Sequence, residues 1–139
     1  MVVVDTNILA YLLIVGDRTK EAQALFARDD HWKSEAFVLV EFSNILATYQ
    51  RLGELDSNQT ERLLGEAQTC LRSLVDLPHV AALRTAQQFR VSAYDARFLA
   101  AAEKLDTRLV TEDAKLRAAA PALTRSLAEA LAAGRGDFP

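Results

Sequence analysis

A chain of 139 residues, half of them apolar, has the size of one globular domain with an ordinary core, so a second domain is not expected. With a net charge of −3, the chain lacks the bulk positive charge that draws proteins to polyanions. Its single cysteine, Cys70, excludes an intrachain disulfide and a cysteine-rich zinc site. The longest apolar run, Ile8 to Val15, is too short to span a bilayer, which predicts a cytoplasmic protein without a membrane segment.

The predicted elements begin with a short β-branched run, Val2 to Val4, typical of a buried strand, and Asp5-Thr6-Asn7 then marks a helix start. Gly53 is placed to end the third predicted helix, and Asp56 or Ser57 to cap the fourth. The expected helices cover residues 8–14, 19–28, 35–52, 57–74, 79–90, 94–105 and 113–119, and the further strands cover 31–34, 74–77, 108–111 and, less regularly, 123–126.

Strands that alternate with helices favour an α/β fold, a three-layer α/β/α sandwich with a short, mainly parallel central sheet. No internal repeat or Pro- or Ser-rich linker divides the chain, so we expect one domain over residues 1–133 and a flexible C-terminal tail over 134–139. The sequence contains neither a glycine-rich nucleotide-binding motif nor a Gly-x-Ser-x-Gly elbow, which argues against chemistry of those kinds.

Four acidic residues interrupt or immediately follow apolar segments, where a carboxylate is costly: Asp5, Glu41, Asp95 and Asp113. Glu41 is the most informative, because it is the only charged residue between positions 36 and 50. Each acid also has a structural explanation. Asp5 can cap the first helix, and Glu41 can pair with an arginine. Ser92 and Asp95 fit a capping box, and Thr111 can cap the helix that follows the strand before Asp113.

A metal site is indicated if these four carboxylates converge, since two of them about 4 Å apart repel by about 4 kcal/mol at an effective dielectric constant near 20. A divalent cation removes that repulsion, and a set of oxygen ligands favours Mg²⁺ or Mn²⁺ over Zn²⁺. His31 and His79 lack the spacing of a zinc motif. The extra polar groups of Thr6, Asn7 and Thr111 can orient the acids.

Four short segments occur in a fixed order: Val-Val-Val-Asp-Thr-Asn ending at Asn7, Glu41 in an apolar helix, Tyr94-Asp95-Ala96 at a helix start, and Leu-Val-Thr-Glu-Asp ending at Asp113. They resemble the motifs of PIN-domain ribonucleases, and the resemblance covers nearly the whole chain. The compact size resembles that of the VapC-type toxins of bacterial toxin–antitoxin pairs.

The resemblance implies a doubly wound sheet whose carboxyl edge gathers Asp5, Glu41, Asp95 and Asp113 around one or two Mg²⁺ or Mn²⁺ ions, with Asp5 as the central ligand. It implies a metal-dependent endoribonuclease, the toxin of a type II system, that uses activated water to cleave single-stranded or structured RNA such as tRNA. The implied partners are RNA, a cognate antitoxin protein and a second copy in a homodimer.

Two alternatives remain open. A PIN nuclease of RNA maturation would have the same site and another substrate. A receiver-like, Mg²⁺-binding regulatory module is less favoured, because it needs an aspartate after its middle strand, where Leu77 is followed by Pro78 and His79. Four bases near the acidic motifs are candidates for holding phosphates or for a solvated surface: Arg97, Lys104, Lys115 and Arg117.

Overall fold

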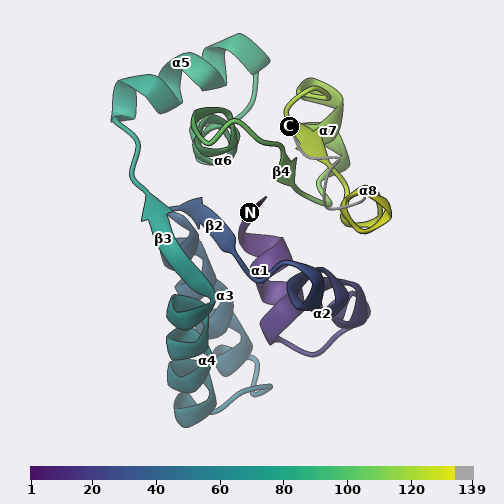
Figure 1. Cartoon of the computed structure of the whole chain (residues 1–139). Coiled ribbons are helices and arrows are strands. Elements are labelled where there is room, and N and C mark those ends of the chain that lie inside the picture. The colour runs from purple at the N-terminus through teal and green to yellow at the C-terminus, as the bar shows by residue number, and fades with distance from the viewer. Residues whose placement is uncertain (134–139) are drawn as a thin grey trace.

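The computed structural model describes residues 1–133 as five parallel strands with helices on both faces (Figure 1). The strand order is β3-β2-β1-β4-β5, and all neighbouring strands are parallel. The predicted α/β sandwich is therefore confirmed. The strands are β1 (Val2–Val4), β2 (Trp32–Glu35), β3 (Leu71–Val75), β4 (Leu109–Val110) and β5 (Thr124–Arg125).

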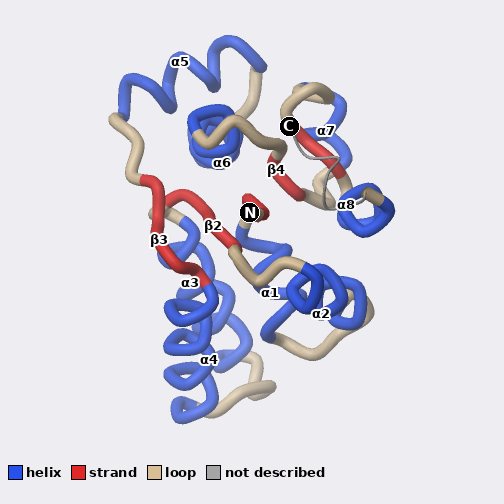
Figure 2. Tube along the Cα trace, viewed as in Figure 1, coloured by secondary structure: helices blue, strands red, loops and turns tan. Residues whose placement is uncertain are grey.

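Residues 1–133 contain eight helices, of which α1 to α7 connect the strands and α8 follows β5 (Figure 2). They are α1 (Thr6–Leu13), α2 (Thr19–Arg28), α3 (Val38–Arg51), α4 (Ser57–Cys70), α5 (His79–Phe89), α6 (Ala93–Lys104), α7 (Ala114–Ala119) and α8 (Leu127–Ala132). Helices α3 and α4 pack as a hairpin on one side of the sheet, whereas α6 packs across β1, β2 and β4 on the other (Figure 1).

The chain reverses its direction across the sheet at β1. It moves from β1 through β2 to β3 and then crosses back to β4 on the far side of β1. In open α/β sheets this arrangement leaves a crevice at the carboxyl ends of the two strands on either side of the reversal, here β1 and β4. Asp5 follows β1 and Thr111 follows β4 at that edge.

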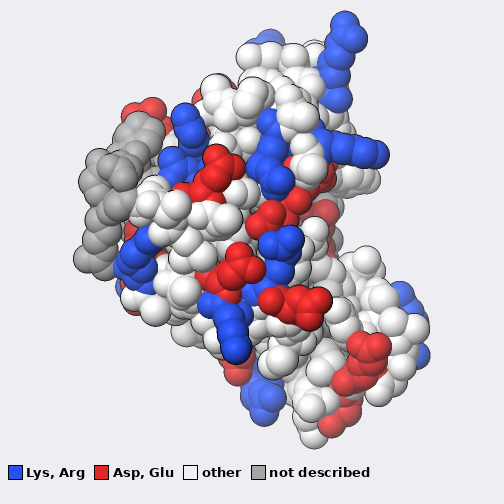
Figure 3. Space-filling view, turned by 90° about the vertical axis from the view of Figure 1, so that its right-hand side faces the viewer, with Lys and Arg blue, Asp and Glu red and all other residues white. Residues whose placement is uncertain are grey.

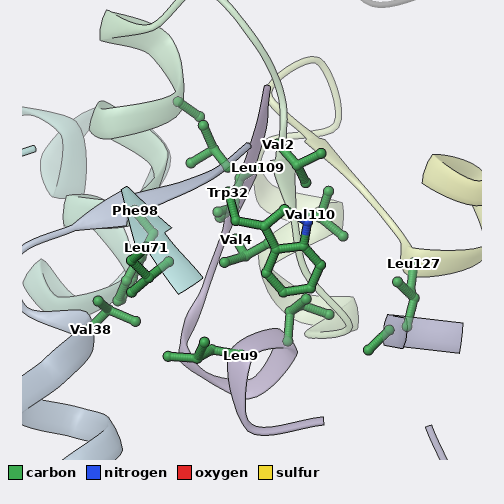
Figure 4. Close-up of a cluster of buried hydrophobic side chains, with 14 of the residues drawn as sticks. Val2, Val4, Leu9, Trp32, Val38, Leu71, Phe98, Leu109, Val110 and Leu127 are labelled. Atoms are coloured by element: carbon green, nitrogen blue, oxygen red, sulfur yellow. The ribbon is translucent and has the colours of Figure 1, made fainter. Parts of the chain in front are cut away.

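The core lies on both faces of β1, whose three valines are all buried. Figure 4 shows the cluster that surrounds them, including Leu9, Phe98 and Leu109. Trp32 is fully buried and packs edge-on against Phe26, with ring centroids 5.2 Å apart. This packing fixes the position of β1 between β2 and β4, and therefore the position of the residues that follow it.

Several helix ends agree with the sequence prediction. The side chain of Asp56 accepts a hydrogen bond from the amide of Gln59 and so caps α4. Gly53 follows the end of α3 with a φ of 76°, a conformation that favours glycine. Helix α8, which we did not predict, is capped in the same way as α4, by Ser126 and Glu129.

The predicted helix over residues 57–74 is wrong at its carboxyl end, because α4 stops at Cys70 and residues 71–75 form β3. Leu71 continues the helical spacing of Leu63 and Ala67, so local periodicity extends the helix too far. Pairing of Leu71 with Trp32, and of Leu74 with Ser34, decides for a strand instead. The strand expected at 74–77 is correct only in its first two residues.

The helix expected to begin at Glu35 begins at Val38, because Glu35 is the last residue of β2 and is buried. In the described residues no helix is long and apolar enough to cross a membrane. The expected tail, residues 134–139, lies outside the part of the chain that the structure describes.

Candidate active site

A cavity of about 610 Å³ opens at the carboxyl edge of the sheet, next to the ends of β1 and β4. All four of the acids singled out in the sequence line it, although they come from four separate parts of the chain. Its lining consists of Asp5, Thr6, Asn7, Phe37, Val40, Glu41, Asn44, Ile45, Tyr94, Asp95, Phe98 and Asp113.

Asp5 is the most buried of the four acids, with 9% of its surface exposed. Its Oδ1 accepts a hydrogen bond from the Ile8 amide at 3.2 Å, so it caps α1 as predicted. The pKa of Asp5 is raised to about 6, mainly by burial; hydrogen bonds from Thr111 and Ile8 oppose this rise, and the charges of Asp95 and Glu41 add to it. The ionised form of Asp5 is therefore disfavoured by burial and by the neighbouring carboxylates.

Glu41 is half-buried on α3, and its Oε1 accepts a hydrogen bond from the Thr6 hydroxyl at 2.6 Å. No lysine or arginine of residues 1–133 forms an ion pair with it, so the structural explanation by an arginine partner does not hold. Thr6 thus connects the first turn of α1 with the carboxylate of α3. The Glu41 side chain also lines the cavity.

Asp95 lies in the first turn of α6, and its amide donates to the hydroxyl of Ser92, which caps that helix. Its side chain is half-buried at the cavity. Burial raises the pKa of Asp95, the charge of Asp113 adds to the effect, and the hydrogen bond with Ser92 opposes it. The capping residue and the acid are therefore compatible, as the sequence suggested.

Asp113, rather than Thr111, caps α7: its Oδ1 accepts hydrogen bonds from the amides of Lys115 and Leu116 at 3.0 and 3.1 Å. The buried Thr111 does not cap the helix itself but contacts the residue that does. Its Oγ1 accepts from the Asp113 amide at 3.1 Å, and its side chain also hydrogen-bonds to Asp5. One hydroxyl thus connects the acids that follow β1 and β4.

Among residues 1–133, no lysine or arginine lines the acidic cavity. Among the bases considered from the sequence, Arg97 pairs with Glu35 at 3.1 Å and Arg117 pairs with Glu112 at 3.3 Å, while the two lysines are exposed. Figure 3 shows basic and acidic side chains interspersed over one face of the molecule rather than gathered into a basic surface. Neither arginine is placed as a free phosphate ligand.

The residues of the cavity fit a hard divalent cation by their chemistry, because among residues 1–133 its lining offers four carboxylates, two hydroxyls and two side-chain amides as oxygen ligands and no softer ligand. Their uncompensated charge fits as well, since burial and mutual repulsion raise the pKa values of Asp5 and Asp95. Within residues 1–133, however, no three His, Cys, Asp or Glu side chains stand as a formed metal cluster.

Several lining residues were missed from the sequence. Asn44 and Ile45 follow Glu41 at helical spacings of three and four, and that spacing places them on the same face of α3. Phe37 could not be recognised as a cavity residue from the sequence, because it fell inside the predicted helix over residues 35–52. In the structure that helix begins only at Val38. Tyr94 precedes Asp95 in a motif, so its proximity to the cavity could have been expected.

The fold and the cavity define a class of protein: a parallel α/β/α sheet with a carboxylate-lined cavity at the point where the chain reverses direction. Comparison with known families specifies it further. The family model of the PIN domain matches residues 2–121, and the chain belongs to this family.

Two proteins of Pyrobaculum aerophilum are similar to this chain. One is Ribonuclease VapC3, which is 26% identical over 125 residues, spanning 87% of this chain and 95% of the relative. The other is PAE2754, whose crystal structure superimposes with a TM-score of 0.76 at 23% identity, covering 94% of this chain and 91% of that one. The second likeness concerns the fold.

The receiver-like alternative is not supported. Its flavodoxin-like strand order is 2-1-3-4-5, whereas the order here places β1 in the middle of the sheet between β2 and β4. An aspartate, Asp76, does follow β3 directly, contrary to the reading of that segment from sequence. It lies at an edge strand, is exposed, and does not line the acidic cavity.

Proposed function

We propose that this chain is a metal-dependent endoribonuclease and the toxin of a type II toxin–antitoxin pair. The observation that carries the proposal is the convergence of Asp5, Glu41, Asp95 and Asp113 on one cavity at the carboxyl edge of the sheet. Membership of the PIN domain family and the similarity to Ribonuclease VapC3 support the ribonuclease assignment.

In this proposal Asp5, Asp95 and Asp113 hold one or two Mg²⁺ or Mn²⁺ ions, and Glu41 binds metal or orients water. The bound cation would stabilise the charge that develops on the phosphate and lower the pKa of water, so no protein nucleophile is needed. Thr6 keeps the Glu41 carboxylate in place through the 2.6 Å hydrogen bond. Thr111 does the same for Asp5 and Asp113, and Asn7 presents its amide at the cavity.

The partners belong to the same proposal. RNA, single-stranded or structured as in tRNA, is the substrate, and a cognate antitoxin protein and a homodimer are what the family resemblance implies. The apolar side chains of Val15 and Val40 are 93% and 60% exposed and offer surface for such an interface. We expect the protein to act in the cytoplasm.

The test is cleavage of a mixed pool of single-stranded RNA and tRNA in the presence of Mg²⁺, Mn²⁺ or EDTA, with the wild type and Asp5→Asn in parallel. Asp30→Asn is the matched control, because Asp30 is an exposed aspartate outside the cavity. We expect metal-dependent cleavage by the wild type and the control, and a loss of at least about a hundredfold in Asp5→Asn. Equal cleavage by all three proteins, or cleavage in EDTA, would contradict the proposal.

A further inference from the structure

Two aromatic rings at the acidic cavity stack on each other outside the hydrophobic core. Phe37, directly before α3, and Tyr94, in the first turn of α6, both line the cavity. Their rings stack with centroids 5.3 Å apart and an interplanar angle of 20°. Tyr94 is 62% exposed, so this large ring contributes a flat surface to the cavity rather than to the interior.

A buried ion pair holds the segments that carry these two rings. The amide of Phe37 donates to Glu35 Oε2 at 2.7 Å, and Glu35 Oε1 accepts from Arg97 Nη1 at 3.1 Å. Glu35 is 1% exposed and Arg97 lies three residues after Tyr94 on α6. The same ion pair therefore holds the backbone of Phe37 and the helix that carries Tyr94. The two rings are preorganised as a result.

The charge of the cavity limits what can bind there. In the part of the chain that the structure describes, its lining contains four carboxylates and no lysine or arginine, so the phosphates of a bound strand find no cationic side chain of that part in it. Affinity for a strand then has to come from a cation and from contacts with its bases. An aromatic face binds an unpaired base of any identity by stacking, and single-stranded RNA offers such bases. The amides of Asn7 and Asn44 lie in the same lining and can hydrogen-bond to base edges.

We propose that Tyr94, supported by Phe37, is a stacking platform for one unpaired nucleobase of the RNA whose phosphodiester enters the acidic cavity. The inference rests on the proposed nuclease function and adds a base-binding subsite to it. The platform positions the strand, and the acids carry out the chemistry.

The experiment measures binding of short single-stranded RNAs in which 2-aminopurine replaces the base at each position in turn. It uses the Asp5→Asn background without added metal, so that the RNA stays intact and the affinity reports contacts other than those of a cation. The variants are Tyr94→Leu and Tyr94→Phe, and Leu83→Ala is a control at an apolar side chain of α5 that is 51% exposed. We expect quenching of one position by the parent, Tyr94→Phe and Leu83→Ala. Tyr94→Leu should lose that quenching and bind about tenfold more weakly. Unchanged quenching and affinity in Tyr94→Leu would overturn the platform.

Cleavage kinetics in the otherwise wild-type protein separate this proposal from the nuclease proposal. Tyr94→Leu should raise KM about tenfold and leave kcat within about twofold, and Tyr94→Phe should restore KM. A normal KM in Tyr94→Leu would overturn the platform while the nuclease stands. Tyr94-dependent quenching by a protein that cleaves no RNA would support the platform and contradict the nuclease.

Discussion

Asp5 has two roles that conflict energetically. Its carboxylate caps α1 through the Ile8 amide, yet it is buried near the carboxylates of Glu41 and Asp95. Asparagine can accept the same capping hydrogen bond without the charge. In the absence of divalent metal, Asp5→Asn should therefore raise the melting temperature, by the equivalent of roughly 1–3 kcal/mol at neutral pH. Thermal unfolding in EDTA measures it. A clear fall in melting temperature would mean that the capping role dominates.

The same residue predicts a pH dependence of stability. The folded-state pKa of Asp5, about 6, exceeds the ordinary value of 3.8, so the folded chain holds this proton more tightly than the unfolded chain. Its contribution to stability is fully present below about pH 4 and is lost as the pH rises through about 6. Urea unfolding of the metal-free protein between pH 4 and 7 should show this decline, and Asp5→Asn should show a smaller one. Parallel profiles would contradict the assignment to Asp5.

Thr111 connects two of the acids through a single buried hydroxyl. In Thr111→Val the Asp113 amide loses its acceptor and Asp5 loses a donor, so unfolding should become easier by about 1–3 kcal/mol. Thr111→Ser should retain most of the stability. Thr69→Val provides the matched control, because Thr69 is exposed and bonds only to a carbonyl of its own helix. An equal effect in both valine variants would exclude a special role for Thr111.

At the scale of elements, the ion pair of Glu35 and Arg97 connects β2 with α6. Arg97 also bonds to the Leu77 carbonyl and to His79 Nδ1, so the start of α5 joins the same network. This network holds the carboxyl end of β2 and the first turns of α6 in their relative positions, beside the acidic cavity.

Removal of one member of this buried pair leaves the other charge without compensation. Arg97→Gln should destabilise the fold by about 3–5 kcal/mol. Arg72→Gln breaks an ion pair with Asp30 in which both side chains are 60% or more exposed, and should cost about 0–1 kcal/mol. Chemical denaturation of the two variants compares them directly. Costs of similar size would show that burial does not distinguish these pairs.

At the scale of the whole molecule, metal binding and folding are linked, since the cavity is assembled from segments at both ends of the sequence. An ion that binds only the folded chain should stabilise it by about 2.7 kcal/mol at a hundredfold excess over Kd. Melting curves with increasing Mn²⁺ or Mg²⁺ should therefore shift upwards for the wild type and for Asp30→Asn. The shift should be much smaller in Asp5→Asn. Equal shifts in all three would indicate binding elsewhere.

Local signals in the sequence determined most of the elements and the candidates for the site. The β-branched run before Asp5, the capping residues Ser92 and Asp56, and the isolated charge of Glu41 are each readable within a few residues. Local chemistry places a strand, a helix start or a costly carboxylate, because capping and periodicity act over one or two turns.

Only the tertiary structure decided which distant residues these local features contact. Pairing with β2 made residues 71–74, which were expected at a helix end, part of β3, and the strand order brought four distant acids to one cavity. It also placed Phe37 against Tyr94 and Glu35 against Arg97, contacts that span 57 and 62 positions of the sequence. Such contacts depend on sheet topology, and no local pattern of the chain encodes which distant partner a residue will find.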